Sequence, residues 1–220
     1  MGIILCEKIT RSFNEKAHIL KNVSMEIEEG SFNVLLGPSG SGKTTMLNIL
    51  GVLDRPSSGK LFLEGEEVSK LSDVKRDRLR RTKLGYVFQS VALVSNMTAF
   101  QNVDFALRIC GYNSRERRIR AEECLDFVGL ANRMKHYPQE MSGGEQQRIA
   151  IARAIAHKPK ILLADEPTAE LDTETGLKVV KMFKELVEKE KMTVLMCTHD
   201  VAMQEIADYR KIMKDGVLID

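Results

Sequence analysis

The fold of this chain is decided by the stretch Gly37-Pro38-Ser39-Gly40-Ser41-Gly42-Lys43-Thr44, which matches the phosphate-binding pattern G-x-x-x-x-G-K-[ST]. An apolar strand is predicted just before it, over residues 32–36, and apolar residues with helical spacing follow it. The glycines let backbone N–H groups surround an anion, and the helix N-terminus adds partial positive charge. We expect Lys43 to reach the β- and γ-phosphates of a nucleotide and the Thr44 hydroxyl to bind Mg²⁺. A simple Gly- and Ser-rich turn is the alternative, and the complete pattern disfavours it.

A second motif, Ile161-Leu162-Leu163-Ala164-Asp165-Glu166, runs four apolar residues into two carboxylates. A buried parallel strand would place both acids at its C-terminal edge, where open α/β sheets bind ligands. Asp165 suits Mg²⁺, which prefers hard oxygen ligands, and Glu166, pointing the other way, can polarise an attacking water. Alone, the motif fits an exposed strand end equally well, but the phosphate-binding loop favours the functional interpretation.

A third motif, Met141-Ser142-Gly143-Gly144-Glu145, precedes a predicted helix. Ser142 and Glu145 have the spacing of a capping box, with the serine as N-cap and the glutamate three residues later. A capping box does not require the two glycines. Glycines at a helix N-terminus let a phosphate approach closely, so the motif also predicts a second anion site.

The composition fits one large or two small globular domains and excludes several classes of protein. The 220 residues are 43% hydrophobic and 29% charged, and Lys+Arg 33 against Asp+Glu 31 leaves a net charge of +2, which does not indicate a nucleic-acid binder. The four scattered cysteines fit neither a zinc site nor a disulfide framework and favour a reducing compartment. No run approaches the ~20 apolar residues of a membrane span, and no signal peptide is recognisable. We therefore expect a cytosolic chain.

The order of predicted elements is typical of an α/β fold with a mainly parallel sheet and an all-helical insert. Apolar runs predict strands over 3–9, 23–27, 32–36, 60–63, 84–88, 161–164, 193–197, 209–213 and 217–219. Helical spacing predicts helices over 46–50, 98–111, 115–128, 142–156 and 175–189, and a short helix from Val201. Two basic runs, 75–83 and 115–120, are interpreted as solvated faces rather than as contacts with an anionic membrane.

These motifs, in this order, resemble those of ATP-binding cassette (ABC) ATPases, and the resemblance covers essentially the whole chain. It rests on the loop 37–44, Gln89 after a strand, MSGGE at 141–145 ahead of QQRIAIARA, LLADEPT at 162–168, Leu171-Asp172, and His199 after a strand. LDRPSSG at 53–59, VFQ at 87–89 and LDTETG at 171–176 further resemble the cassettes of macrolide-export, lipoprotein-release and cell-division systems.

The resemblance implies a single domain, 1–220, of α/β class with a P-loop NTPase core. Residues 1–88 and 159–220 would form that core with an N-terminal antiparallel β-subdomain, and residues 89–158 a helical subdomain. It implies an ATPase that closes as a head-to-tail homodimer on binding ATP and drives a separate membrane permease from the inner face of the membrane. A cassette that instead signals through its membrane partner to an envelope process remains the alternative. Chromosome and DNA-repair relatives carry a long coiled coil that is lacking here, and translation factors carry two cassettes.

The resemblance also implies roles for individual residues. Glu166, His199 and Gln89 would be catalytic, and Thr44, Gln89 and Asp165 would hold Mg²⁺. Phe13 would stack on adenine, and Ser142 and Gly144 would contact the γ-phosphate of ATP held by the other subunit. The full implied ATP-binding set is Phe13, Gly37, Pro38, Ser39, Gly40, Ser41, Gly42, Lys43, Thr44, Thr45, Ser142, Gly143, Gly144, Glu145 and Asp172, the last at the dimer seam.

Two residues depart from the pattern of the family. Glu145 stands where the signature motif usually has glutamine, and Glu170 lies in the loop at the implied dimer seam. Both add negative charge near a phosphate site, so we expect them to weaken closure of the dimer modestly.

Overall fold

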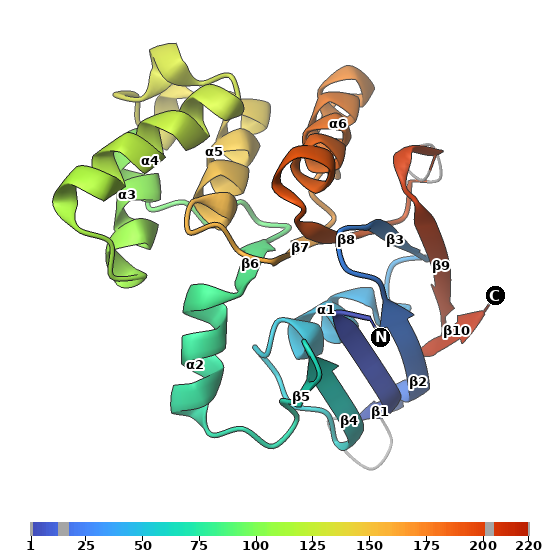
Figure 1. Cartoon of the computed structure of the whole chain (residues 1–220). Helices are drawn as coiled ribbons and strands as arrows, with labels where there is room; N and C mark the ends of the chain where they lie inside the picture. The colour runs from blue at the N-terminus through green and yellow to red at the C-terminus, as the bar shows by residue number, and fades with distance from the viewer. Residues whose placement is uncertain (1, 13–17, 201–204, 220) are drawn as a thin grey trace.

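The computed structural model describes residues 2–12, 18–200 and 205–219, and two sheets pack against the helix α1 (Lys43–Leu50) (Figure 1). The four-stranded antiparallel sheet has the order β2-β1-β4-β5, with bounds His18–Ile27, Ile4–Ser12, Ser58–Leu63 and Glu66–Glu67. The six-stranded sheet has the order β10-β9-β3-β8-β7-β6, with bounds Val217–Ile219, Tyr209–Lys214, Phe32–Leu36, Thr193–Thr198, Ile161–Asp165 and Leu84–Val87. All its neighbouring strands are parallel except β10 and β9. The predicted α/β class with an antiparallel N-terminal sheet is confirmed.

The remaining helices divide into a cluster and two that flank the sheet. The cluster, at the upper left of Figure 1, contains α3 (Ala99–Ile109), α4 (Ser114–Phe127) and α5 (Gly143–Ile155), with the short turns η1 (Ala131–Arg133) and η2 (Pro138–Glu140) between α4 and α5. The helices outside the cluster are α2 (Asp73–Thr82) and α6 (Thr173–Glu190). The predicted all-helical insert is therefore present between β6 and β7.

The central strands are apolar on both faces because each face packs on a different core. In β3, Phe32, Val34 and Leu36 belong to the core shared with α3–α6, whereas Leu35 belongs to the core shared with α1 and the antiparallel sheet. The strands β7 and β8 alternate in the same way, and all residues of β3, β7 and β8 are buried. The period-two alternation thus fixes which side chains face each core, and a shift of one residue in the strand pairing would exchange the two faces.

Parallel pairing brings the carboxyl ends of three buried strands to one edge of the sheet. Leu36 of β3 pairs with Thr198 of β8, and Asp165 of β7 pairs with Cys197 of β8. The loop after β3, the acids at the end of β7 and the residues after β8 consequently lie together, as expected for a ligand site in an open parallel sheet.

The helix α2 is the main element that the sequence did not predict. Its residues DVKRDRLRRT include only one buried apolar side chain, that of Leu79, so no apolar stripe marks it as a helix. The interpretation of the run 75–83 as a solvated face is wrong for Arg76, which is 7% exposed. Its guanidinium donates to the carbonyl oxygens of Val52 (2.8 Å) and Asp54 (3.0 Å) and so anchors α2 to the chain after α1. The helix predicted from Val201 begins outside the described residues.

His157 joins the end of α5 to the start of β6, and we expect it to make the protein less stable at mildly acidic pH. Its Nε2 donates to the carbonyl oxygen of Leu84 (3.0 Å), and burial lowers the pKa of the imidazole. Because the unfolded chain then binds a proton more readily, stability is greatest above the ordinary histidine pKa and is lost as the pH falls through it towards the lower folded value.

The measurement is urea unfolding of the wild type and a His157→Gln variant between about pH 7.5 and about pH 5.5, across the histidine range. Glutamine can still donate to Leu84 but does not titrate, so the variant should lose less stability than the wild type over this interval. Equal losses would show instead that the folded protein protonates His157 as readily as the unfolded chain does.

Candidate functional site

The loop of residues 37–42 joins β3 to α1, and its glycines are required by the backbone around them. A Cβ on Gly37 would lie 2.2 Å from the carbonyl oxygen of Met213 in β9, which leaves no room for a side chain. Gly42 has φ 106°, a conformation that L side chains rarely adopt, and it is the N-cap of α1. The N–H of Gly216 donates to the carbonyl oxygen of Ser41 (3.0 Å) and ties the loop to the β9–β10 turn.

Lys43, the first residue of α1, has a buried side chain that is only 4% exposed. Three oxygens surround its ammonium group. Its Nζ donates to the carbonyl oxygens of Gly37 (2.8 Å) and Pro38 (3.1 Å) and forms an ion pair with Glu166 Oε1 (3.2 Å). An ammonium group has three protons, so these contacts use all of them. A phosphate must therefore exchange with some of these oxygens to receive the lysine.

Asp165 ends β7 with its carboxylate against the loop. Thr44 Oγ1 donates to its Oδ1 (3.2 Å), and burial raises the pKa of Asp165, with the Glu166 charge adding to that effect. A hydroxyl and a carboxylate oxygen at hydrogen-bond distance, at the base of the loop, are the hard donors that Mg²⁺ takes together with waters and phosphates. The residues therefore fit the predicted ion. Gln89 lines one cavity together with Thr44 and can add an amide oxygen.

At Glu166, directly after β7 ends at Asp165, the backbone leaves the extended conformation of the strand. Its φ of 44° is unusual for a residue with a side chain, and such strain is common where a functional group must be aimed. The N–H of Glu166 donates to the carbonyl oxygen of Cys197 (2.9 Å), and its Oε2 accepts from His199 Nδ1 (2.6 Å). Both carboxylate oxygens are thus engaged, one by Lys43 and the other by His199.

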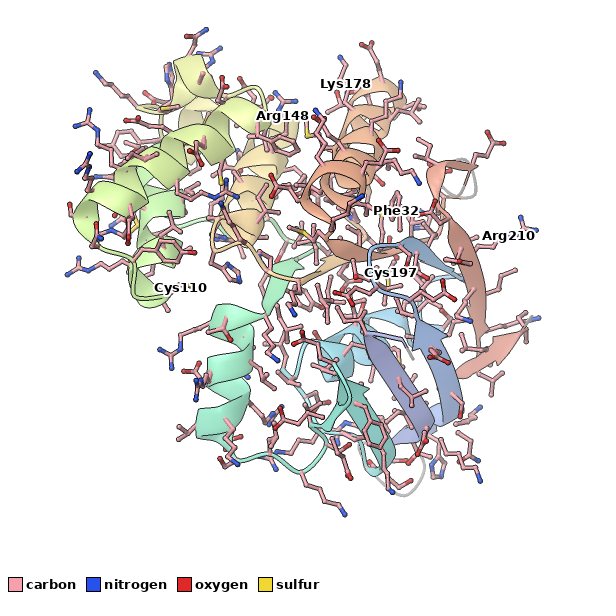
Figure 2. The ribbon with its side chains drawn as sticks, viewed as in Figure 1. Phe32, Cys110, Arg148, Lys178, Cys197 and Arg210 are labelled. Atoms are coloured by element: carbon pink, nitrogen blue, oxygen red, sulfur yellow. The ribbon has the colours of Figure 1, made fainter. Side chains whose placement is uncertain are left out.

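Cys197, labelled in Figure 2, lies in β8 directly beneath the loop, and its Sγ is 3.9 Å from the carbonyl oxygen of Lys43. Burial raises the pKa of the Cys197 thiol well above its usual value, so the group stays protonated and packs in the core. Cys197 is therefore a core residue rather than a nucleophile.

Lys43, Thr44 and Glu166 line a cavity of about 470 Å³ at the edge of the parallel sheet. It is lined by Ile19, Ser39, Gly40, Gly42, Lys43, Thr44, Thr45, Gln89 and Glu166. Ile19 of β2 is the one lining residue that the sequence analysis did not single out, and nothing in an apolar strand residue marks it in advance. Phe13, predicted to stack on adenine, lies outside the described residues.

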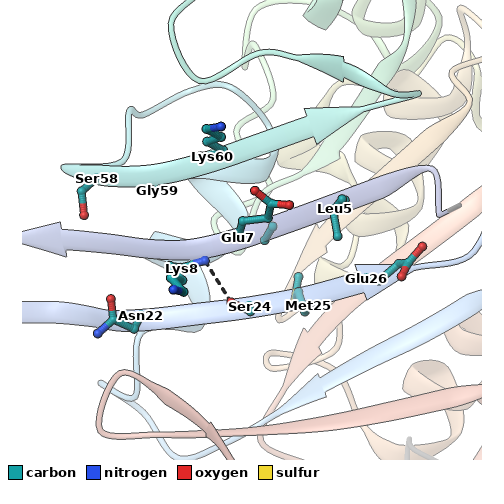
Figure 3. Close-up of a pocket in the computed structure, with 11 residues that line it drawn as sticks. Leu5, Glu7, Lys8, Asn22, Ser24, Met25, Glu26, Ser58, Gly59 and Lys60 are labelled. Carbon is teal, nitrogen blue, oxygen red and sulfur yellow. Dashed lines mark hydrogen bonds between the residues drawn. The ribbon is translucent and has the colours of Figure 1, made fainter.

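A larger hollow of about 830 Å³ lies elsewhere, on the outer face of the antiparallel sheet (Figure 3). Side chains of mixed chemistry line it, including Glu7, Lys8, Glu26 and Lys60, and the N–H of Lys8 donates to Ser24 Oγ (2.9 Å). None of the predicted site residues lines this hollow within the described chain. The smaller cavity, which the predicted site residues line, is therefore the candidate site.

The segment 142–145 starts α5 and forms the predicted capping box. Ser142 Oγ accepts from the N–H of Glu145 (3.3 Å), and Glu145 Oε2 accepts from the N–H (2.9 Å) and the hydroxyl (3.1 Å) of Ser142. A Cβ on Gly144 would lie 2.9 Å from Thr175 Cγ2, whereas a Cβ on Gly143 would meet nothing within 4 Å. Packing within the chain thus accounts for Gly144 but leaves Gly143 unexplained.

The close approach of Gly144 to Thr175 places the segment 142–145 beside the N-terminus of α6. Asp172 is the N-cap of α6, and its Oδ1 accepts from the N–H of Thr175 (3.0 Å). Hydrogen bonding by the Thr175 side chain first, and then by this N–H, lowers the pKa of Asp172. Neither Asp172 nor any residue of 142–145 lines the cavity around Lys43 among the residues the structure describes. The predicted site residues therefore form two groups on this chain, one at the loop and one at the starts of α5 and α6.

A scan against family models matches residues 20–169 to the ABC transporter family. The chain belongs to the ABC transporter family. It is 42% identical to the lipoprotein-releasing system ATP-binding protein LolD of Bdellovibrio bacteriovorus over 198 residues, 90% of each chain. It is 41% identical to the macrolide export ATP-binding/permease protein MacB of Mannheimia succiniciproducens over 223 residues, all of this chain and 34% of MacB.

Among solved structures, the chain is similar to the dimeric ATP-binding cassette MJ0796 bound to ADP and Pi. The TM-score is 0.91 at 39% identity, and the match covers 99% of this chain and 97% of that one. This ABC cassette is thus an ATP-binding ATPase, as the motifs predicted. No helix in the described part of the chain is long and apolar enough to cross a membrane.

Proposed function

We propose that this cassette is the motor subunit of a transporter: ATP binding closes a head-to-tail homodimer, hydrolysis reopens it, and the motion drives a separate membrane permease. The observation that carries the proposal is the separation of the predicted site into two groups, with Lys43 and Glu166 at one cavity and the segment 142–145 outside it. A second copy in head-to-tail arrangement would bring its segment 142–145 to each cavity. The space next to Gly143, where a Cβ would meet nothing within 4 Å, would leave room for the phosphates of the bound ATP.

In this proposal, the residues around the cavity divide the work on ATP. Lys43 leaves its oxygens to bind the β- and γ-phosphates, and the loop N–H groups surround the β-phosphate. Glu166, released from Lys43, accepts a proton from the attacking water. His199 orients the Glu166 carboxylate by donating to it, and would hydrogen-bond the γ-phosphate. A Mg²⁺ ion held by Thr44, Asp165 and Gln89 would neutralise charge on the phosphates.

The arrangement of the chain supports the proposed division into a core, residues 1–88 and 159–220, and a helical subdomain, residues 89–158. Gln89 lies at the cavity at the point where the chain leaves β6 for the helical cluster. The following segment, 90–102, is the part we propose to contact the permease. Arg153 donates to the carbonyl oxygens of Val91 (3.1 Å) and Ala92 (2.5 Å), and Asn102 bonds the backbone at Val94, so the segment is held firmly against the cluster.

A site-specific photo-cross-linker at Val94, whose side chain is 37% exposed in this segment, tests the permease contact. In membranes of the native host, we expect cross-links from this position to an integral membrane protein, which would place the cassette at the cytoplasmic face. A cross-linker at Val74, 79% exposed on α2, is the matched control and should capture no membrane protein. Capture of only non-membrane partners at Val94, or equal capture at both valines, would contradict the motor proposal.

A further inference from the structure

The start of α5 presents a carboxylate, Glu145, to the place where the proposed dimer brings a triphosphate. Its Oε2 is 3.1 Å from the Ser142 hydroxyl, the group predicted to meet the γ-phosphate. An anion one hydrogen bond away from an incoming anion repels it, and partial exclusion of water would strengthen the repulsion. The carboxylate is 19% exposed, so bulk solvent screens it only in part.

The other oxygen of this carboxylate is paired with Arg133, at the end of η1. Arg133 Nε lies 3.3 Å from Glu145 Oε1, while its Nη1 donates to His136 Nε2 (3.2 Å). Arg148, one turn along α5 (Figure 2), also attracts the carboxylate. The Ser142 N–H first, then the Ser142 hydroxyl, and after them these two cations keep the pKa of Glu145 below its usual value. The Glu145 carboxylate is therefore an anion that is paired with a cation of the same chain.

The segment that carries Arg133 is fixed to the helical cluster by backbone bonds. The N–H groups of Ala99 and Phe100, at the start of α3, donate to the carbonyl oxygens of His136 (2.8 Å) and Met134 (2.9 Å). The arginine thus lies on a turn held between the start of α5 and α3, whose first turn belongs to the proposed permease-facing segment.

We propose that Arg133 is a positioning residue for the segment 142–145: it neutralises and orients Glu145, so that the triphosphate of a second copy meets the Ser142 hydroxyl without facing an unpaired carboxylate. This inference rests on the proposed function, in which that segment completes the site of another subunit. It also changes the expectation drawn from the sequence, because Glu145 does not add a bare negative charge to the closed dimer.

A double-mutant cycle between Arg133 and Glu145 tests the inference. All proteins carry Glu166→Gln to slow hydrolysis, and dimer dissociation constants in Mg-ATP are measured by analytical ultracentrifugation. Removal of the cation by Arg133→Gln should weaken the dimer about tenfold, because it exposes a partly buried carboxylate to the phosphates. Arg133→Lys, which keeps the charge, should recover most of this loss.

The decisive protein is the double variant Arg133→Gln/Glu145→Gln. Without the carboxylate there is nothing to neutralise, so its dimer should be within about twofold of that of Glu145→Gln alone. The tenfold loss in Arg133→Gln should also shrink as salt rises, since salt screens repulsion between charges. Arg118→Gln is the control: this arginine of α4 is 77% exposed and pairs with Glu122, so its loss should leave the dimer unchanged.

Two results would overturn the role of Arg133. One is an Arg133→Gln dimer as tight as its parent; the other is the same loss with and without Glu145, which would mean that Arg133 acts through His136 or the turn. A third result is distinguishable from both: if the parent protein itself forms no dimer in Mg-ATP, the proposed function fails and the inference fails with it.

Discussion

A Glu166→Gln variant is expected to bind ATP as well as the wild type and to hydrolyse it at least about a hundredfold more slowly, the loss typical of removing a general base. The amide cannot accept a proton from the attacking water. It also loses the charge that holds Lys43 at 3.2 Å, so the lysine should move to the phosphates with less competition. The variant should therefore accumulate an ATP-bound dimer, visible by size-exclusion chromatography with and without Mg-ATP, together with a loss of phosphate release.

The control for this experiment is Glu185→Gln, which removes an equivalent charge from an exposed pair with Lys189 on α6. It should hydrolyse ATP at the wild-type rate and show no excess of dimer. If Glu166→Gln also hydrolysed at the wild-type rate, the base would have to be another group, and the contacts of Glu166 with Lys43 and His199 would be structural.

Much of the parallel sheet and the phosphate-binding loop could be predicted because their signals are local. The boundaries of β3 at Phe32 and Leu36 are those expected from an apolar run that ends at a glycine, and the cap at Ser142 follows from residues three apart. By contrast, α2 has too few apolar residues to show a helical period, and its stability depends on contacts such as that of Arg76 with Val52.

The details of the site that escaped prediction are contacts between residues distant in sequence. The pairing of Lys43 with Glu166 joins the first residue of α1 to the residue after β7, and nothing in either motif indicates that one restrains the other. The positive φ of Glu166 accompanies a bond from its N–H to Cys197 of the neighbouring strand, which the motif does not reveal. Likewise, the charge of Glu145 is evident in the sequence, but its counter-ion comes from the turn η1 and is found only in the fold.

The proposed composite site makes the second large prediction: two variants that each fail to dimerise should dimerise when mixed. Lys43→Ala removes the main cation for the phosphates, and Ser142→Arg places a bulky side chain where phosphate from the second copy would lie. In a homodimer, either change disables both sites. In a mixed head-to-tail dimer, one site carries both defects, and the other combines an intact loop with an intact segment 142–145.

The mixture should therefore regain ATP-dependent dimerisation and trap about one nucleotide per dimer, because binding to the single intact site stabilises the assembly. Separate affinity tags on the two variants isolate the mixed dimers, and both carry Glu166→Gln so that nucleotide is retained. Since Ser142→Arg also removes a helix N-cap, Asn113→Arg is the matched control. Asn113 is the N-cap of α4 and forms the same kind of capping box. Its replacement removes a helix cap that lies outside the proposed dimer seam, so dimerisation should stay intact. If Ser142→Arg alone dimerises like this control, or verified mixed dimers hold no nucleotide, residues 142–145 do not act on a second copy. The segment would then serve only to cap α5.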